Sequence, residues 1–494
     1  MASETRRTHH QVTFAVLAAS VTAYALLQSL VTPVLPTIQA DLHTTQNTVT
    51  WVLTAYLLSA SIFTPIMGRI GDIVGQERVF VATLGALAAG SLLAALAGNV
   101  QVMIIARVIQ GIGGGVLPLA FGIIRDEFPR EKLSGAIGAI ASLSAVGAGL
   151  GIVLAGPIVN ALDYHWLFWL PMILTVAAAV AAAVFVPRSP VRTPGRISWA
   201  PAVLLSAWLV ALLVGLSQAP VWGWGSNRII GLFTAAVVLA VGWVEVERRS
   251  AMPLIDMTMM RRTAVWTNNL VALLFGVGMY AVFAFLPEFV QSPRSTGYGF
   301  GASITQSGLI LLPMSVTMFV VGLWSNRLAA RLGGKTVVLA GALVGAVSMA
   351  LLAFAHTHTW ELYVATAVMG AGFGLAFAAM SSLIVSAVPA EQTGVASGMN
   401  ANIRTIGGSI GAALMASVVT ASPAADGLPR EAGYTHGFAM LGAALLVGAF
   451  AAVLIPVTRQ PSRIAVSGEP ETAGRADSTT TAPAGGTVVG DRAE

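Results

Sequence analysis

The feature of the sequence that most restricts its fold is a succession of long apolar stretches with almost no charge. A helix needs about 20 mainly apolar residues to cross a hydrocarbon layer roughly 30 Å thick, and such stretches fill most of the 494 residues. Hydrophobic residues make up 56% of the chain and charged residues only 10%. A water-soluble domain does not carry that mixture, so the sequence predicts an all-α, polytopic membrane protein.

Fourteen such stretches can be counted, separated by short charged or Pro- and Gly-rich loops. They lie near residues 12–35, 49–67, 79–97, 101–123, 135–157, 166–186, 200–218, 229–246, 265–289, 303–324, 336–354, 361–384, 396–420 and 436–456. An even number of crossings predicts that both termini lie on the same side of the membrane.

The basic residues test this count, because Lys and Arg near helix ends are retained in the cytoplasm. With the N-terminus inside, 21 of the 26 fall on the cytoplasmic side, and only Arg228, Arg294 and Arg430 fall outside. This pattern predicts a multi-pass protein of a bacterial inner membrane with both termini cytoplasmic. The basic residues are scattered among loops, which argues against a nucleic-acid partner.

A weak internal repeat divides the chain. Gly111, Gly113 and Gly115 recur 259 positions later, and Gly138, Gly147 and Gly151 recur 260 positions later. Transporters are commonly built from such repeats. We therefore expect a cytoplasmic N-terminus at 1–11, a six-helix bundle at 12–190, two inserted linker helices within 191–262, a second six-helix bundle at 263–457, and a disordered cytoplasmic tail at 458–494.

Three segments have features that point to a mechanism. Gly68, Asp72, Gly75 and Arg78 form a turn after the second stretch, in which Asp72 would face the positive end of the next helix. Arg107 lies inside the fourth stretch, one turn from Gln110 and followed by Gly111 and Gly113. An arginine at mid-membrane costs about 2.5–3.5 kcal/mol on insertion scales, so it needs a partner or an aqueous cavity.

The fifth stretch carries four glycines, Gly138, Gly147, Gly151 and Gly156. Small residues spaced along a helix allow a neighbouring helix to approach closely, and a glycine-rich helix also bends readily. Helix packing and a hinge or seal are both open interpretations of this segment.

These three segments resemble motifs A, B and C of the major facilitator superfamily. The third resembles that superfamily's antiporter motif, with Ile152 and Ala155 where the motif has Pro and Gly. Together with the segments at 51–56, 253–256 and 313–314, they are similar to the subfamily of 14-spanner drug:proton antiporters, over roughly residues 12–456. The resemblance implies alternating access, with a multidrug or antibiotic exported in exchange for protons.

The sequence departs from that subfamily where the proton would be expected to bind. The acidic residue usual in the first helix is replaced by Leu27, and Gln28 is its only strongly polar neighbour. Our hypothesis is that Glu288 exchanges protons, that Asp72 and Arg107 take part in switching, and that Arg404 is a second buried charge.

The substrate cavity is expected between the two bundles near mid-membrane, where aromatic and amide groups suit small amphipathic or apolar ligands. The candidate residues are Trp51, Tyr56, Trp266, Asn268, Asn269, Tyr280 and Phe283.

Other functions stay open within transport. A lipid or metabolite exporter, a uniporter or a symporter without the usual proton coupling would explain the missing acid. An enzyme is not expected, because no catalytic set, phosphate loop or cofactor motif is present. No metal site is expected, because the chain has no cysteine and its seven histidines show no metal-binding spacing. The expected partners are substrate, protons and lipid, with the chain acting as a monomer.

Overall fold

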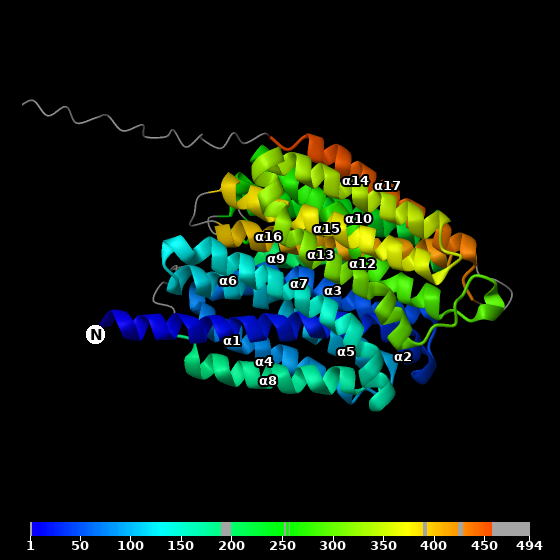
Figure 1. The fold of residues 1–494 in the computed structure, drawn as a ribbon, viewed down its shortest axis with the longest axis horizontal. Coiled ribbons are helices and arrows are strands. Elements are labelled where there is room, and N and C mark those ends of the chain that lie inside the picture. Colours follow the sequence, from blue (N-terminus) through cyan, green and yellow to red (C-terminus); the bar gives the residue numbers. More distant parts are fainter. Residues whose placement is uncertain are drawn as a thin grey trace, which may run out of the picture. The chain divides into compact units, whose positions relative to one another are not determined.

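The computed structural model describes residues 2–188, 199–250, 253–255, 257–388, 393–422 and 428–456. The predicted tail at 458–494, Asp256 and the start of the linker at 191–198 lie outside these residues. Every regular element in the described ranges is a helix, and the long helices run side by side as a bundle (Figure 1). The predicted all-α class is confirmed.

Twelve helices of the described residues are long and apolar enough to cross a membrane. Two further long helices, α7 (Arg130–Ala161) and α16 (Thr393–Val419), pack among them but do not meet that criterion. The structure therefore shows a multi-pass protein with about twelve apolar spans, and the count of fourteen stays a prediction.

We call the first set of helices the N-terminal group. Besides α7 it contains α1 (Ala2–Leu30), the 3-10 turn η1 (Thr32–Val34), α2 (Leu35–Asp41), α3 (Gln46–Val74), α4 (Gln76–Ala95), α5 (Val100–Gly111), the 3-10 turn η2 (Ile112–Gly115), α6 (Val116–Glu127) and α8 (Trp166–Phe185). Polar side chains start two of these helices, because Thr45 and Asn99 accept hydrogen bonds from the first turns of α3 and α5. A run of three glycines separates α5 from α6 within one crossing.

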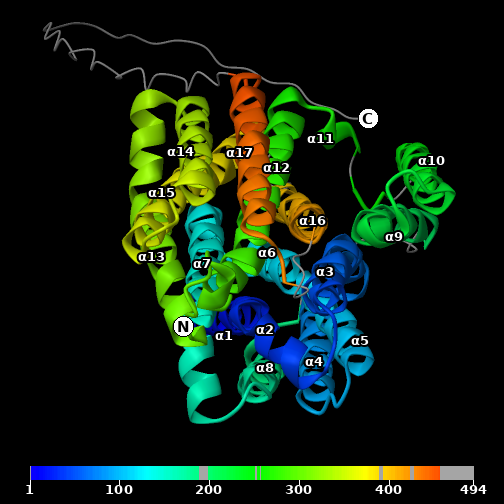
Figure 2. The ribbon, with the colours of Figure 1, turned by 90° about the vertical axis from the view of Figure 1, so that its right-hand side faces the viewer.

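Two helices follow that belong to neither bundle, α9 (Trp199–Trp222) and α10 (Asn227–Arg249), before the short α11 (Met257–Met260). They lie side by side at one edge of the molecule, next to α3 (Figure 2). Leu205, Leu209 and Leu213 lie on one face of α9, four residues apart, and pack against Leu58 of α3 and Ala413 of α16.

The C-terminal group contains α16 and five more long helices. These are α12 (Thr263–Gln291), α13 (Ile304–Leu332), α14 (Gly334–Phe354), α15 (Thr359–Ala387) and α17 (Glu431–Val453), with the 3-10 turn η3 (Arg294–Thr296) after α12.

The two groups pack their helices in the same pairs. α1 packs on α7 as α12 packs on α16, α3 packs on α5 as α13 packs on α15, and α4 packs on α8 as α14 packs on α17. The close approaches match as well. A Cβ at Gly147 or Gly151 would press on the carbonyls of α1, and one at Gly407 or Gly411 on those of α12.

The bundle has two ends that are used below to locate residues. α3 begins at Gln46, whose side chain is bonded to Glu288, and it ends two residues after Asp72. Its 29 residues span about 43 Å at 1.5 Å per residue. We call these the Glu288 end and the Asp72 end.

Candidate transport site

Asp72 lies in the last turn of α3, where the chain turns sharply into α4. Gly75 between the helices has φ of +119°, a conformation that residues with a side chain rarely adopt. The Asp72 carboxylate accepts a hydrogen bond of 2.8 Å from Nε2 of Gln76. Guanidinium nitrogens of Arg125 and Arg69 lie 3.6 and 3.8 Å from its oxygens. Asp72 therefore joins α3 to α4 and α6.

Arg78, which the turn motif includes, does not reach Asp72. Its side chain is about half exposed, and its Nε lies 3.8 Å from Glu77. Arg125 is the residue that reaches Asp72 from another helix. Gly68, the first residue of the motif, faces Pro118 of α6 with room for a Cβ. The contact of Asp72 with the N-terminus of α4 is thus made through the side chain of Gln76.

A cavity of about 300 Å³ opens at the Asp72 end between the two groups. Its wall includes Asp72, Arg69 and Arg125 from the N-terminal group, and Met399 and Asn402 of α16 from the C-terminal group. The segment before α11 contributes Pro253 and Leu254. Asn402 is buried, and neither its carbonyl oxygen nor its amide nitrogen has a hydrogen-bond partner in the part of the chain that the structure describes. The cavity wall therefore has an unsatisfied amide.

Arg107 is completely buried in α5, at 0% exposure. Its Nε donates to the carbonyl of Val52 at 2.9 Å, and one terminal nitrogen donates to Oε1 of Gln110 at 2.8 Å. Gln110 donates in turn to Ser91 of α4 at 3.0 Å. The guanidinium carbon lies 4.3 Å from the centre of the Tyr56 ring. Arg107 therefore ties α3, α4 and α5 together, and no carboxylate of the described residues pairs with it.

The glycines after Arg107 permit this packing. A Cβ at Gly111 would overlap the side chain of Ser59 on α3, and one at Gly113 would lie 2.8 Å from Leu87. The Ser59 hydroxyl donates to the carbonyl of Val108 at 2.6 Å. The second motif thus brings α5 close enough to α3 for direct hydrogen bonds to the backbone.

Tyrosines gather beside Arg107 in the middle of the bundle. Tyr24 of α1 and Tyr56 of α3 are both buried, and the Tyr56 hydroxyl has no hydrogen-bond partner among the described residues. Tyr280 of α12 accepts a hydrogen bond of 2.9 Å from Nε2 of Gln28. We call Tyr24, Tyr56 and Tyr280 the tyrosine cluster. It contains residues of both groups.

Arg404 of α16 reaches the same cluster from the other side. Its charge acts on the hydroxyls of Tyr24 and Tyr280. The guanidinium lies over the ring of Phe377, at 4.7 Å from the ring centre. Its Nε is buried without a hydrogen-bond partner. Arg107 lies over Tyr56 of this cluster and Arg404 lies near Tyr280, although the two arginines are 297 residues apart in the sequence.

The glycines of α7 lie at two different contacts. A Cβ at Gly147 would lie 2.9 Å from the carbonyl of Thr22, and one at Gly151 would overlap Ser29, both on α1. Gly156 instead faces Thr305 of α13, which belongs to the C-terminal group. The surroundings of Gly138 lie outside the described residues. Both the packing and the sealing interpretations of this segment are consistent with these contacts.

Glu288 of α12 is partly buried and accepts two hydrogen bonds from neutral donors. The Tyr434 hydroxyl of α17 donates to its Oε1 at 2.6 Å, and Nε2 of Gln46 donates to its Oε2 at 2.7 Å. No cation pairs with the carboxylate among the described residues. Because Gln46 belongs to the N-terminal group, Glu288 also joins the two groups.

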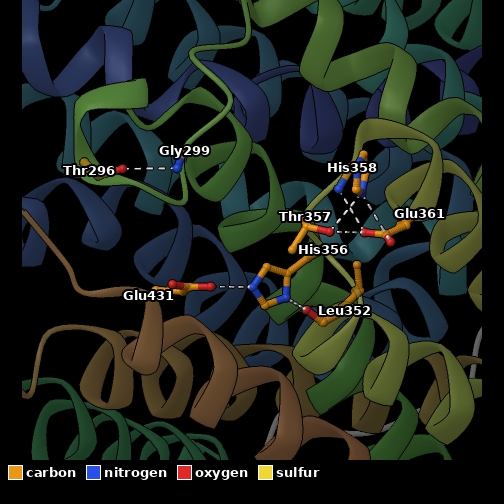
Figure 3. A network of polar contacts seen from close by, with 8 residues as sticks. All are labelled: Thr296, Gly299, Leu352, His356, Thr357, His358, Glu361 and Glu431. Carbon is orange, nitrogen blue, oxygen red and sulfur yellow. Dashed lines mark hydrogen bonds and ion pairs between the residues drawn. The ribbon is translucent and has the colours of Figure 1, made fainter.

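A second polar cluster lies close to Glu288 and is shown in Figure 3. Nε2 of His356 lies 3.0 Å from Oε1 of Glu431, and Nδ1 lies 2.8 Å from the carbonyl of Leu352. Glu431 is one turn before Tyr434 on α17. The ring of Phe289 contacts both His356 and Tyr434. A chain of polar and aromatic contacts thus leads from His356 to Glu288.

Hydrogen bonds between the groups gather at the Glu288 end. Besides the bond from Gln46, Gln291 donates to the carbonyl of Pro33 at 2.8 Å, and Asn160 donates to Thr305 at 2.9 Å. At the Asp72 end, the described residues have a cavity between the groups instead. The structure is therefore closed at the Glu288 end and hollow at the Asp72 end.

The remaining predicted cavity residues are not all brought together. Phe283 lies edge-on to Tyr280, with ring centres 6.2 Å apart. Asn268 and Asn269 are buried but bind within the C-terminal group, to the carbonyl of Met380 and to Asn400. Trp266 is 41% exposed, and Trp51 is partly buried near the start of α3. Only Tyr56, Tyr280 and Phe283 lie near the two arginines.

Sequence reasoning missed several residues that the structure places at these sites. They are Tyr24, Gln46, Arg69, Gln76, Arg125, Phe377 and Tyr434. Arg125 follows the apolar stretch at 101–123, and only its tertiary contact with Asp72 distinguishes it from other arginines at the ends of such stretches. Among the described residues, no group of three or more His, Cys, Asp or Glu side chains could hold a metal ion.

The sequence is similar to several bacterial transporters. It is 29% identical over 425 residues to the multidrug transporter protein MdtP of Bacillus subtilis, covering 83% of this chain and 77% of that one. It is 29% identical over 428 residues to the tetracenomycin C resistance and export protein of Streptomyces glaucescens, covering 85% and 77%. A multidrug resistance protein B homolog of Mycobacterium tuberculosis is 29% identical over 395 residues, covering 78% and 71%.

Solved structures share the fold at low sequence identity. The human organic anion transporter MFSD10 superposes with a TM-score of 0.64 at 15% identity, covering 90% of this chain and 99% of that one. The nucleoside transporter NupG gives 0.62 at 15% identity, with the same coverage. The family model of the Major Facilitator Superfamily matches residues 17–412 and 269–485. Transporters of this family are not enzymes, so that prediction is confirmed, and the chain belongs to the major facilitator superfamily.

Proposed function

We propose that this chain exports antibiotics and other drug-like molecules across a bacterial inner membrane. Its relatives in Bacillus, Streptomyces and Mycobacterium are named for multidrug transport, multidrug resistance or antibiotic export. Their similarity covers 78–85% of this chain, including both helix groups. The substrate is a small molecule that enters between the groups.

The observation that supports a transport cycle is the structural difference between the two ends of the bundle. Hydrogen bonds such as Gln46 to Glu288 join the groups at one end, whereas a cavity of about 300 Å³ separates them at the other. Alternating access requires each end to open while the other is closed. With the Asp72 end in the cytoplasm, this conformation would receive substrate from inside the cell.

The membrane arrangement belongs to the same proposal. We assign fourteen spans by adding α7 and α16, which are 32 and 27 residues long, to the twelve apolar helices. Both termini are cytoplasmic in this assignment. Residues 12–190 and 263–457 form two six-helix bundles, α9 and α10 form the linker within 191–262, and the chain works as a monomer.

Glu288 is our candidate for the proton carrier. It is partly buried, has two neutral hydrogen-bond donors and no cationic partner among the described residues, and it bonds across the groups. A carboxylate in that position changes its charge without having to break an ion pair. Asp72 and Arg107 would act in switching, because each joins three helices of the N-terminal group.

One proton per cycle is enough to drive export. A proton-motive force near 180 mV corresponds to about 4 kcal/mol per charge, which is roughly a thousandfold concentration ratio.

Lipid or metabolite export, or transport without proton coupling, is the competing function, because buried Leu27 stands where the subfamily has an acid. Gln28 beside it is bonded to Tyr280.

Transport into inverted membrane vesicles tests the proposal. We expect an imposed inside-acidic gradient to drive uptake of a drug, a protonophore to abolish it, and Glu288→Gln to remove the gradient dependence. Glu245→Gln is the matched control, because Glu245 is an exposed carboxylate of α10 whose ion pairs among the described residues are with Arg248 and Arg249 of its own helix. Drug uptake that persists in the presence of the protonophore would contradict proton coupling. Uptake that stays proton-driven in Glu288→Gln would contradict the assignment of Glu288 as the proton carrier.

A further inference from the structure

Arg404 has an unusual environment for a charged residue in the middle of a bundle. Among the described residues its guanidinium makes no hydrogen bond and no ion pair, and its Nε is buried without a partner. The guanidinium lies over the ring of Phe377, at 4.7 Å from its centre, and near Tyr280. An arginine carries five N–H donors in a planar fork, so this side chain has donors left for a ligand.

The backbone around Arg404 is closely packed against α12, and this packing fixes the position of the Arg404 Cα. A Cβ at Gly276 of α12 would overlap the carbonyl of Arg404. A Cβ at Gly408, one turn further along α16, would overlap the ring of Tyr280. α12 and α16 therefore touch on both sides of this position, and the free guanidinium is not the result of a loosely packed helix.

Accessible surface remains around this guanidinium. Gln28 is bonded to Tyr280, Arg404 lies over Phe377, and all four side chains are partly exposed. The cavity at the Asp72 end reaches Asn402, and Arg404 lies about 3 Å further along the axis of α16. Positions two apart point to different sides of a helix, so Arg404 lies at the next level of the bundle and is not part of the cavity wall.

The charges around this space are all of one sign. Arg107 and Arg404 both act on Tyr24, and neither pairs with a carboxylate of the described residues. Glu288 is eight residues beyond Tyr280 on α12, about 12 Å along the helix axis, and is bonded to Gln46 and Tyr434. Unpaired cations away from water attract an anion strongly, because the low dielectric weakens their screening.

An apolar wall completes the site. Phe275, Phe373 and Phe377 form an aromatic cluster, with ring centres 5.5 to 5.8 Å apart. Phe377 is the member over which Arg404 lies. A flat apolar or aromatic body could lie against these rings while an acidic group reaches the guanidinium.

We propose that this site binds organic anions, with Arg404 as the residue that receives the acidic group. The substrate class is an aromatic or otherwise apolar body that carries a carboxylate or a similar acid, such as an acidic phenol. Arg404 donates two N–H groups to the acid, Phe377 and its neighbours hold the body, and Arg107, which lies over Tyr56, adds a second positive charge in the tyrosine cluster. This inference rests on the proposed export function and names its substrate class.

A direct binding experiment tests the role of Arg404. The full chain in detergent is titrated with pyrenebutanoate and with the corresponding carboxamide, which has the same ring and chain length but no charge. We expect the carboxylate to bind at least tenfold more tightly than the carboxamide. Arg404→Gln should remove this preference by weakening only the carboxylate, and Arg404→Lys should keep the preference with weaker binding.

The matched control is Arg228→Gln. Arg228 also lies over an aromatic ring, Trp222 at 5.6 Å, but it is exposed at the start of α10. The Arg228→Gln variant should bind the carboxylate and the carboxamide as tightly as the unmodified chain does. Equal binding of the two probes to the unmodified chain overturns the inference. So does an unchanged preference in Arg404→Gln, or, if that variant does not fold, a lost preference in the charge-retaining Arg404→Lys.

Vesicle transport separates this inference from the proposed function. If neutral or cationic drugs are exported while carboxylates are neither bound nor moved, export stands and the anion site is refuted. If the carboxylate binds through Arg404 but no compound is moved under any gradient, the site stands and the export function is refuted.

Discussion

The hydrogen bond between Gln46 and Glu288 should set how often the Glu288 end opens. Nε2 of Gln46 donates to the carboxylate at 2.7 Å across the two groups, so the bond exists only while that end is closed. A hydrogen bond to a charged group contributes about 1.5–3 kcal/mol. Glu288 is only partly buried, which favours the lower value. Gln46→Leu should therefore shift the population toward the open form by about tenfold.

The absence of cysteine makes this shift measurable with introduced labels. Spin labels at Asp163 and Arg294 would report the width of the Glu288 end, because both residues are exposed in loops of different groups there. Labels at Lys132 and Arg331 would report the Asp72 end. We expect Gln46→Leu to increase the long-distance population at the first pair and to decrease it at the second.

The control is Gln306→Leu, which removes an amide at the same end. Among the described residues, the Gln306 side chain bonds to Ser303, the N-cap of its own helix, in a capping box, so the distance distributions should stay as they are. An unchanged distribution at both pairs in Gln46→Leu would refute the reasoning that this bond holds the groups together. Equal shifts in the two variants would refute it as well.

Three further predictions follow from the packing. Arg107→Ala should abolish transport and lower the thermal midpoint of unfolding, because it removes hydrogen bonds that join three helices. Normal transport by this variant would exclude a role of Arg107 in switching. Gly151→Leu should destabilise the protein by about 1–3 kcal/mol through overpacking against α1, whereas Gly85→Leu, which faces open space, should be neutral in the same thermal unfolding assay. Burial and the hydrogen bond of 2.9 Å to Asp41 raise the pKa of Tyr164. Its stabilisation is complete below the unfolded pKa near 10 and lost only as pH rises through the higher folded value. The Tyr164→Phe variant should therefore be less stable by about 0.5–1.5 kcal/mol at both pH 7 and pH 9, and a difference that disappears by pH 9 would contradict this.

Several parts of the fold could be predicted because they depend on local composition. A run of about 20 uncharged residues has one stable arrangement in a membrane, since a helix satisfies its own backbone hydrogen bonds. The boundaries follow from equally local signals, such as Thr45 and Asn99 at helix starts and Gly75 at the turn. The repeat was also visible, because glycine is needed wherever two helices touch.

The candidate site was only partly predictable. Arg107 and Arg404 were conspicuous as charges inside apolar stretches, and Glu288 as an acid within one. Their partners were not, because a tyrosine or glutamine on an apolar helix has the same sequence signature whether it faces lipid, a neighbour or a cavity. Trp266 and Tyr280 looked equivalent, yet one is 41% exposed and the other is bonded to Gln28.

Composition and periodicity thus account for the membrane location, the helices and the presence of buried charge. Which charges meet, and what they face, came only from tertiary packing. Arg107 and Arg404 are 297 residues apart; the packing of α5 on α3 places one beside Tyr56, and the packing of α16 on α12 places the other near Tyr280. The physical reason is that the cost of burying a charge is set locally, whereas the group that offsets this cost lies wherever another helix places it.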